Sequence, residues 1–597
     1  MSEKSWKRGE DYVVYDRKAD GSVAQCNHCH KTFTNERSVA YQHKKFCSAF
    51  KTQGEQQKSI MDYIDNKIGG SYTKLQKIVR YICTSATSIN ATTDQTFIDL
   101  IQEGFSYETI RKAIIDYAED VKQKTKEKIA DATVALVMDG ATIIHSGWYC
   151  IGVATSKSIY FYGSYHLSET TTRAISHQVN EVIEEIKKET RACVVGVCTD
   201  NASNISNVFD PACPDSINKL FGKHLLRVPC QAHTANLVLA SYERLSPSFA
   251  RLRSRIRGYA RTLRDQNKQE LFGIKCRCPP IREQRWFTDF DALQWIVMFS
   301  GKLRNAHKNM PNIIGSKSCP ITKSWIELYF ALRPLATFTW SIEADVLPIS
   351  SAYQKFENMK KELARLESEG NKHAKNMLKI VQSRWSSTAD ENLLKLTFFT
   401  QNSNLMNWRV KYDRASLKAS NRNKTKEDID EYTRLGNEAN LMIETTKKYC
   451  KFMGYDFTGA EEEIKFTLHH ASPPHSKNGD DFWVSLSVSG PNTNKQSIAL
   501  NKKELNIEHL SQIAEFYYSL SCLPASEAYC ERVFKNMREL FDIYRMSASD
   551  DLIAAQTLVR MSIRMERRER NEIDDVFEDV FEDCEPSELE DAEEEDQ

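Results

Sequence analysis

The hydrophobic pattern of the chain changes its period near residue 131. Between residues 73 and 130, apolar side chains recur every three or four positions, as in YTKLQKIVRYICTSA, and this spacing predicts helices. Continuous apolar runs of strand length follow: ATVALVMDGAT, GWYCIGVATS and SIYFYGSYHLS. A helical stretch, a fourth apolar run in ACVVGVCTDNASN, a short fifth run in HLLRVPC and another helix come next. Three strands followed by alternating helices and strands predict an α/β fold.

Helical periodicity returns near residue 300 and extends toward residue 500, as in AYQKFENMKKELARLESEG. Near its end, GAEEEIKFTLHHASPPHSKNGDDFWVSLSVSG interrupts the period with proline and glycine, so we expect an exposed excursion there. Residues 505–565 then resume an amphipathic pattern. Within it, LSCLPASEAYCERVF predicts a helix that Pro524 and Ser526 open.

Two of the apolar runs lead into an aspartate, Asp139 and Asp200. An aspartate at such a position is as often a turn or helix-capping residue. However, open α/β sheets also bind ligands at the C-terminal ends of their strands, so two aspartates in this strand order predict a shared site. With a third acid they can hold two divalent metal ions about 4 Å apart and cleave a phosphodiester. Mg²⁺ prefers such oxygen ligands.

A glutamate, Glu531, occupies an unusual place in the C-terminal helix, close to Val533 and Phe534. A solvated helix face would explain it, and so would an ion pair with Arg532 or Arg538. The two aspartates add another explanation, because their site needs a third carboxylate that can lie far away in the sequence.

Length and composition limit the class of protein. A chain of 597 residues is expected to form two to four domains. No apolar run approaches the roughly 20 residues of a membrane span, and the charged N-terminal segment lacks the apolar core of a signal peptide. We therefore expect a cytosolic or nuclear protein. Its 16 cysteines would then be reduced, and clustered ones would bind metal rather than form disulfides.

The formal net charge of zero conceals two opposite regions. Residues 572–597 contain 15 acidic residues and no Lys or Arg, which leaves a charge of +15 on residues 1–571. We expect the acidic tail to be disordered. It is either a solubilising appendage or a segment that shields a basic surface or recruits a basic partner. The basic body fits a polyanion such as nucleic acid.

The segment CNHCHKTFTNERSVAYQHKKFC has the most specific local spacing. Residues 21–30 predict a hairpin that carries a Cys-x2-Cys knuckle, and residues 35–47 predict a helix. A histidine and a cysteine four positions apart share one face of this helix. Together the two pairs can close a tetrahedron around Zn²⁺. The four predicted zinc ligands are Cys26, Cys29, His43 and Cys47.

Other interpretations of this segment stay open. His28 and His30 are alternative ligands, the spacing can arise by chance among reduced cysteines, and a zinc module can bind protein rather than DNA. Basic residues around the predicted site can contact phosphates. They are Lys31, Arg37, Lys44 and Lys45.

Several motifs in this order resemble the hAT family of DDE transposases, which often begin with a BED-type zinc finger. No single motif is decisive, but their order and spacing make the resemblance specific, and it covers much of residues 20–570. The matching residues are Asp139 in VMDGAT, Asp200 in VCTDNASN, Cys230 and His233 in VPCQAHTANL, Arg285 and Trp286 in REQRWFT, and Glu531 in PASEAYCERVF.

The resemblance implies an α/β fold with an RNase H-like catalytic core, a large all-helical insertion that interrupts it, and a small N-terminal zinc finger. The implied regions are a BED-like finger at 1–50, a linker at 51–72, a helical DNA-binding or oligomerisation region at 73–130, the first part of the core at 131–295, the mainly helical insertion at 296–504, the completion of the core with a dimerisation region at 505–571, and the acidic tail at 572–597.

The resemblance also implies a function, that of a nuclear cut-and-paste DNA transposase. Asp139, Asp200 and Glu531 would be its catalytic triad and would hold Mg²⁺ or Mn²⁺, while Zn²⁺ would be structural. Its partners would be the double-stranded DNA of transposon ends and of the target. Because two ends must be brought together, we expect at least a homodimer.

Three further matched residues are expected to contact DNA: His233, Arg285 and Trp286. Each has a structural alternative, because His233 can be a buried hydrogen-bonded residue and Trp286 a core residue. Cys230 and His233 also resemble half of a zinc site. A second Arg-Trp pair, in SRWSST at Arg384 and Trp385, is the weaker match to the family motif.

The chain departs from the family pattern at three positions. Ala141 stands where relatives often carry a Trp, Cys530 replaces the usual Ser before the final acid, and Lys535 replaces a Ser after the Phe. None of these changes removes a metal ligand. Two other functions remain alternatives: a domesticated, catalytically inactive DNA-binding regulator of the same ancestry, and a metal-dependent nuclease without strand transfer.

Overall fold

The structure is a computed structural model, and the chain divides into two compact units, residues 1–117 and 118–597. The described part is mixed α/β and mostly helical, in agreement with the predicted class. The described residues are 12–15, 23–26, 32–34, 72–92, 97–98, 104–143, 145–264, 274, 276–281, 287–309, 319–343, 348–387, 390–454, 461–469, 507–540 and 549–569.

The first unit contains a small antiparallel sheet. Its strands are β1 (Tyr12–Tyr15), β2 (Val23–Cys26) and β3 (Thr32–Thr34), in the order β1-β2-β3. The predicted hairpin at 21–30 therefore extends further along the chain, since β2 pairs with β3 from Val23↔Thr34 onward. Strand β1 was not predicted. Cys26 is the last residue of β2.

The remaining predictions for the finger lie outside the described residues. They are the helix at 35–47, the ligands Cys29, His43 and Cys47, and the basic residues Lys31, Arg37, Lys44 and Lys45. The finger and its zinc site stay predictions.

Helices α4 (Lys74–Ser85), α5 (Ile89–Thr92) and the start of α7 (Tyr107–Lys128) complete the first unit. Thr73 caps α4 by a capping box, because its side chain accepts from the Gln76 N–H while the Gln76 side chain accepts from the Thr73 N–H. Arg80 is fully buried on α4 and donates to the Tyr117 hydroxyl. The helical periodicity over 73–130 thus corresponds to helices.

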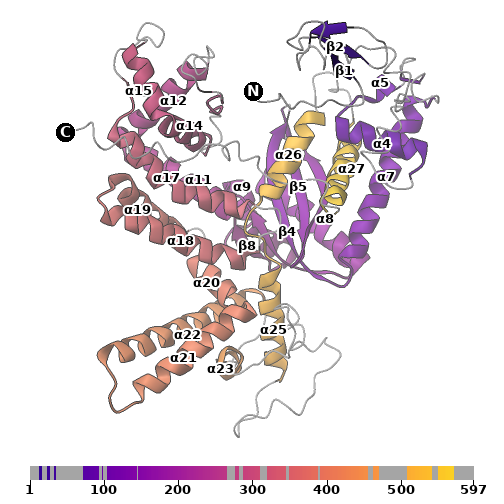
Figure 1. The fold of residues 1–597 in the computed structure, drawn as a ribbon. Helices are drawn as coiled ribbons and strands as arrows, with labels where there is room; N and C mark the ends of the chain where they lie inside the picture. Colours follow the sequence, from indigo (N-terminus) through magenta and orange to yellow (C-terminus); the bar gives the residue numbers. More distant parts are fainter. Residues whose placement is uncertain are drawn as a thin grey trace. The chain divides into compact units, whose positions relative to one another are not determined.

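The second unit is organised around a five-stranded mixed sheet (Figure 1). The strands lie in the order β6-β5-β4-β7-β8. The first three form an antiparallel meander, and β7 and β8 continue it in parallel with β4. All five match the apolar runs of the sequence. Their bounds are β4 (Thr133–Ile143), β5 (Ser146–Ala154), β6 (Ile159–Leu167), β7 (Cys193–Thr199) and β8 (Leu226–Pro229).

Strand β4 is longer than its apolar run. It continues past Asp139 to Ile143, because pairing with β5 persists through Ile143↔Ser146. Its parallel pairing with β7 ends earlier, at Met138↔Thr199. Asp139 therefore lies inside a strand, at the point where one neighbour stops and the other continues.

Helices cover both faces of this sheet. Val134, Leu136 and Met138 of β4 pack in one cluster with side chains of α8 (Thr172–Thr190), such as Val179. On the opposite face, α26 (Ala528–Leu540) contacts β4 and β5, and α27 (Asp550–Glu569) contacts β6. Figure 1 shows these two C-terminal helices in yellow against the sheet. The last segment of the sequence thus completes the layer around the first strands.

A helical body follows β8, and its helices share one large hydrophobic core that includes the fully buried Trp325 and Trp385. Its helices are α11 (Gln231–Leu245), α12 (Pro247–Arg264), α14 (Phe287–Met298), α15 (Ser300–Asn309), α17 (Lys323–Ile342), α18 (Ile349–Ser368), α19 (Lys372–Ser387), α20 (Glu391–Phe399), α21 (Asn402–Ala419), α22 (Lys426–Phe452) and α23 (Glu461–His469).

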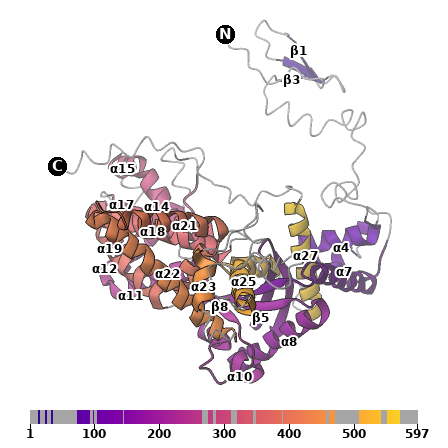
Figure 2. The same cartoon turned by 90° about the horizontal axis from the view of Figure 1, so that it is seen from below.

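One predicted excursion is partly wrong. The beginning of this excursion, Glu461–His469, forms helix α23, because Ile464 and Leu468 are four residues apart and both are buried. Helix α25 (Ile507–Ser521) then leads back to the sheet, and it contacts α18 and α23 as well as β4 (Figure 2). This helix connects the helical body to the segment that carries Glu531.

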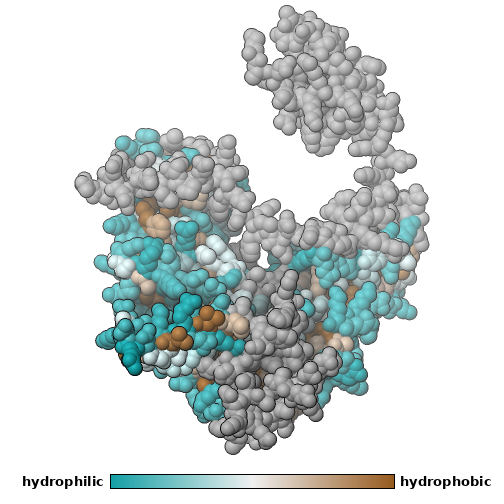
Figure 3. Space-filling view, turned by 60° about the horizontal axis from the view of Figure 1, so that its bottom comes forward, coloured by the Kyte–Doolittle hydropathy of each residue, from teal (hydrophilic) through white to brown (hydrophobic). Residues whose placement is uncertain are grey.

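The described surface is largely hydrophilic on the face in Figure 3, where hydrophobic residues form small, separate groups. Three large apolar side chains of the helical body are more than half exposed: Leu245 is the last residue of α11, and Val410 and Leu417 lie seven residues apart on α21. Among the described residues, no helix combines the length and the hydropathy that crossing a bilayer requires.

Candidate active site

Asp139 and Asp200 lie side by side where the parallel pairing between β4 and β7 ends, in the middle of the strand order. They directly follow the last pair of the parallel ladder, Met138↔Thr199. Because side chains alternate along a strand, Asp139 continues the face of Ala135, and Asp200 continues the face of Cys198. Both faces belong to the side of the sheet that packs against the helical body. The two aspartates are therefore neighbours on adjacent strands, and a site that they share stays a prediction.

Backbone N–H groups orient both carboxylates. The Gly140 N–H donates to Asp139 Oδ1 at 2.7 Å, and the Ala202 N–H donates to Asp200 Oδ1 at 3.1 Å. Arg227 on β8 fixes the chain after β7, since it donates to the Asp200 carbonyl at 2.6 Å and to Asn201 Oδ1 at 3.1 Å. The two aspartates are thus held by main-chain geometry rather than by ion pairs of their own carboxyl groups.

The glycine after Asp139 has a steric reason. Gly140 pairs across the ladder with Tyr149, and a Cβ at Gly140 would come within 2.7 Å of the Tyr149 ring. Burial, followed by the charges of Asp200 and Asp139, raises the pKa of Tyr149 to about 12. Tyr149 is therefore a neutral phenol near the two carboxylates, and no motif in the sequence had pointed to it.

Glu531 approaches from helix α26. The Ser526 hydroxyl accepts from the Ala528 N–H at 2.9 Å at the start of this helix, as predicted. The Cys530 thiol donates to the Val137 carbonyl at 3.5 Å and thereby ties the helix to β4. Tyr529, Cys530 and Val533 are buried, whereas Glu531 is exposed in the first turn. The buried residues on either side of Glu531 therefore hold the helix against the sheet, while the glutamate itself stays accessible.

Electrostatics connect the three acids. Burial is the main cause that raises the pKa of Asp139 to about 8, and the charges of Asp200 and Glu531 raise it further. The Gly140 N–H and, more weakly, Arg538 oppose this rise. Such mutual repulsion operates only between groups that are near one another. Asp139 therefore lies near enough to Asp200 and Glu531 to be affected by their charges, and these three acids are called the acidic cluster below.

His233 belongs to the same neighbourhood. It lies in the first turn of α11, where its N–H donates to Cys230 Sγ at 3.3 Å. Burial lowers the pKa of its imidazole, while Asp200 and Glu531 act in the opposite direction. Cys230 is fully buried and serves as the N-cap of α11. The helix start thus explains the Cys-x2-His spacing without a zinc ion.

The two Arg-Trp pairs have different outcomes. Arg285 and Trp286 lie outside the described residues, so their role stays a prediction. Trp385 is a core residue, since it is 0% exposed, stacks on Phe356 and donates from Nε1 to Gln231 Oε1 at 2.9 Å. The weaker match is thus a residue that fixes the start of α11.

Ala141, which stands where relatives often carry a Trp, lies opposite another tryptophan on the neighbouring strand. Ala141 pairs across the ladder with Trp148 of β5. Trp148 is only 1% exposed and stacks on His166, with ring centroids 5.4 Å apart. A fully packed ring cannot receive a base, so Trp148 does not substitute for an exposed Trp at position 141.

Sequence reasoning missed one acid of this neighbourhood, Glu527. It precedes α26, one helical turn before Glu531, and it is 3% exposed. The i, i+4 spacing to Glu531 within PASEAYCERVF was the available signal.

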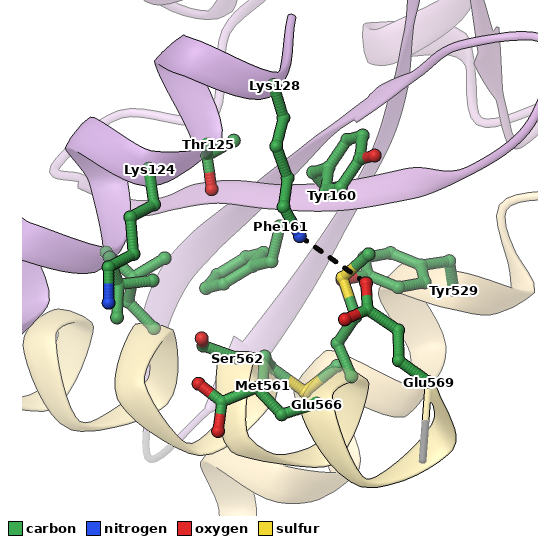
Figure 4. A pocket seen from close by; sticks show the side chains of 13 residues that line it. Lys124, Thr125, Lys128, Tyr160, Phe161, Tyr529, Met561, Ser562, Glu566 and Glu569 are labelled. Atoms are coloured by element: carbon green, nitrogen blue, oxygen red, sulfur yellow. Dashed lines mark hydrogen bonds and ion pairs between the residues drawn. The ribbon is translucent and has the colours of Figure 1, made fainter. Parts of the chain in front are cut away.

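A cavity of about 80 Å³ lies behind α26, separate from the acidic cluster (Figure 4). Side chains of α7, β6, α26 and α27 line it, including Lys124, Tyr529 and Met561. Lys128 Nζ and Glu569 Oε1 form an ion pair of 3.4 Å at this cavity. Because Tyr529 is two residues before Glu531, the packing around the cavity supports the helix that carries the glutamate.

The donor set of the acidic cluster fits a divalent cation in charge and in chemistry, because it presents several carboxylate oxygens of one sign. In the side-chain conformations of the described residues, no three His, Cys, Asp or Glu groups converge closely enough to enclose a metal ion. Mutual repulsion separates like charges, and a cation would draw them together.

Comparisons with known proteins return no match, either among protein-family models or among curated proteins.

Proposed function

We propose that the protein is a DDE-type DNA transposase of the hAT kind, which cleaves transposon ends and joins them to target DNA with the help of a divalent metal ion. The observation that carries the proposal is that Asp139, Asp200 and Glu531, from distant parts of the sequence, meet in one acidic cluster. A carboxylate with a strongly raised pKa that lies near other acids, as Asp139 does, is typical of catalytic sites.

The arrangement of the elements supports an RNase H-like core. Numbered along the chain, its strands lie in the order 3-2-1-4-5, and only the second is antiparallel to the rest. A long helical body separates the strands from the helix that carries the third acid. A core of this kind, interrupted by a helical insertion, accounts for both features.

In this proposal Asp139, Asp200 and Glu531 hold Mg²⁺ or Mn²⁺. The chemistry that such cations supply is activation of the attacking oxygen and stabilisation of the leaving oxygen of a phosphodiester. The N–H groups of Gly140 and Ala202 orient the two aspartates before DNA binds. His233, with its lowered pKa, is a neutral imidazole at pH 7 and can donate a hydrogen bond to a phosphate oxygen.

Further parts of the proposal follow from the sequence. A Zn²⁺ finger and the basic residues of the body would bind the double-stranded DNA of transposon ends, with Arg285 and Trp286 near the cleaved strand. Because two ends must be joined together, the working form would be a homodimer or larger. A DNA substrate implies that the protein acts in the nucleus.

The decisive experiment measures cleavage of labelled end DNA, taken from the flanks of the genomic copy, in Mg²⁺ or Mn²⁺. We expect the full chain to cut and Glu531→Gln to bind the same DNA without cutting. Glu539→Gln is the matched control, since Glu539 lies on the same helix but pairs with Arg560. Specific binding without cutting by the wild type would favour the domesticated regulator instead.

A second assay separates a transposase from a nuclease. The full chain is given a pre-cleaved end and a plasmid target. A transposase joins the 3′-hydroxyl of the end to the plasmid, whereas a nuclease cuts DNA and never joins it. Continued cutting with no joined product would contradict strand transfer.

A further inference from the structure

Glu527 is the most deeply buried acid near the proposed site. Its carbonyl accepts from the Cys530 N–H at 2.7 Å and from the Glu531 N–H at 3.4 Å, so it occupies the cap position of α26. Its side chain is on the interior side of this turn, and the residue is 3% exposed. Acids are almost never buried to this extent unless they are paired or bind a metal.

The carboxyl group of Glu527 has only part of the hydrogen bonding that it needs. The Cys230 thiol donates to it. The Oε2 atom is buried, and no described residue forms a hydrogen bond with it. A buried oxygen without a partner costs free energy, and native structures rarely keep one without a function or a bound ligand.

The charges around Glu527 are mostly of its own sign. Asp139 and Glu531 both act on it electrostatically. The positive charge of Arg227 interacts electrostatically with Glu527. The guanidinium nevertheless donates its hydrogen bonds to Thr199 Oγ1, the Asp200 carbonyl and Asn201 Oδ1. Glu527 therefore faces the acidic cluster with an oxygen that Arg227 does not cap.

We propose that Glu527 is a fourth carboxylate of the cation site, whose free Oε2 supplies an oxygen to the divalent cation held by Asp139, Asp200 and Glu531, either directly or through a metal-bound water. The inference rests on the proposed function. It explains both the burial of the acid and its unpartnered oxygen, which a Ser or Ala at this position would avoid.

A purely structural role is the competing explanation. In that case Glu527 would serve only as acceptor for the Cys230 thiol and would link the start of α26 to the start of α11. A Gln would keep that acceptor and the packing volume but would remove the charge. Glu527→Gln therefore distinguishes the two roles.

The test is Mn²⁺ binding to the full chain, followed by electron paramagnetic resonance, without DNA. We expect Glu527→Gln to weaken Mn²⁺ binding at this site by at least about tenfold. Asp139→Asn should remove the same binding event, and the difference from wild type excludes background binding to the acidic tail. Glu515→Gln is the matched control, because Glu515 is a half-buried glutamate on α25 whose raised pKa has burial as its cause.

Thermal unfolding provides the second readout. With no metal added, we expect Glu527→Gln to melt at the same temperature as wild type, because the amide keeps the volume and the acceptor oxygen of the side chain. Its stabilisation by Mn²⁺ should be smaller than that of wild type. If the amide variant does not fold, Glu527→Asp retains the charge on a shorter side chain and should also bind Mn²⁺ more weakly.

The outcomes separate the inference from the proposed function. Wild-type Mn²⁺ affinity in Glu527→Gln, together with lost affinity in Asp139→Asn, would overturn the role of Glu527 and leave the cation site intact. Equal binding by wild type, Asp139→Asn and Glu527→Gln would reject the site itself, and with it the metal-dependent function.

Discussion

Two acidic regions of the second unit differ in the charges that surround their carboxylates. In the helical body, Asp289 is neutralised, since it accepts from Arg253 at 2.7 Å and from Arg257 at 2.7 and 2.8 Å. At the sheet edge, Asp139 instead faces Asp200 and Glu531, and its pKa rises to about 8. A buried acid that contributes to stability is paired with cations. Acids that lie near one another without such pairing indicate a site for a ligand of positive charge.

The largest expected effect is on catalysis. Asp139→Asn removes a proposed metal ligand, and we expect cleavage of end DNA to fall by at least about a thousandfold, or about 4 kcal/mol of transition-state stabilisation. Single-turnover cleavage at saturating Mg²⁺ measures it. Asp289→Asn, if it folds at the assay temperature, should cut at a rate close to that of wild type. A similar loss in both variants would erase the contrast between the two regions.

The next effect is on stability, and it should appear only in the paired region. Asp289→Asn removes the carboxylate that the buried Arg253 and the neighbouring Arg257 share, and leaves Arg253 paired with Glu243, so we expect a loss of about 3 kcal/mol in unfolding free energy. Urea unfolding followed by circular dichroism measures it.

Asp291, on the same helix, is the control for this variant. Burial raises its pKa to about 6, so its charge is unfavourable and Asp291→Asn should be neutral or stabilising. If Asp291→Asn also destabilised the protein strongly, the loss in Asp289→Asn could not be assigned to its ion pairs.

The pH dependence of stability should also differ between the regions. The pKa of Asp139 rises from 3.8 to about 8 on folding, so between these values the folded state binds more protons than the unfolded state. Stability without metal should therefore fall as the pH rises from about 4 to about 8 and then level off.

Thermal melts across this range, with and without Mg²⁺, test the expectation. Asp139→Asn should flatten the slope, and Mg²⁺ should reduce it in the wild type. An unchanged slope in Asp139→Asn would mean that the acidic cluster does not control it.

The smallest effect is expected at a surface pair. Asp131 and Arg191 form an ion pair of 2.7 Å, but both side chains are more than half exposed. Asp131 has a left-handed backbone with φ 55°, which asparagine also tolerates. Asp131→Asn should leave the midpoint of urea unfolding almost unchanged, because solvent screens an exposed ion pair. A larger loss would mean that ion pairs at the surface resemble the buried Asp289 network.

Much of the core could be predicted because the signals are local. Each apolar run became a strand, since a buried strand needs a continuous apolar stretch whatever its neighbours are. The two aspartates could be paired in advance because parallel strands end at the same edge. The extension of β4 beyond Asp139 could not, because it depends on pairing with β5.

Other features depend on contacts between distant segments. For Glu527 the spacing to Glu531 is the local signal, but it does not show that the side chain is buried, and the motif around Trp385 does not show that its ring belongs to the core. Gln231 accepts from Trp385 and its N–H donates to the Ala525 carbonyl at 2.9 Å, so three remote segments meet at the start of α11. Such contacts depend on how the helical body closes over the sheet.

The amino-acid sequence was enough to predict the α/β class, the order of the strands along the chain and the acids that are candidates for a metal site. These features could be predicted because hydrophobic period and residue chemistry are properties of short segments. Three other features became visible only in the folded chain. Asp139 lies near Asp200 and Glu531, Glu527 is buried with an Oε2 atom that no described residue hydrogen-bonds, and Trp385 belongs to the hydrophobic core. Burial and the sign of the nearest charge arise when remote segments pack together, and these two quantities distinguish a stabilising acid from a site.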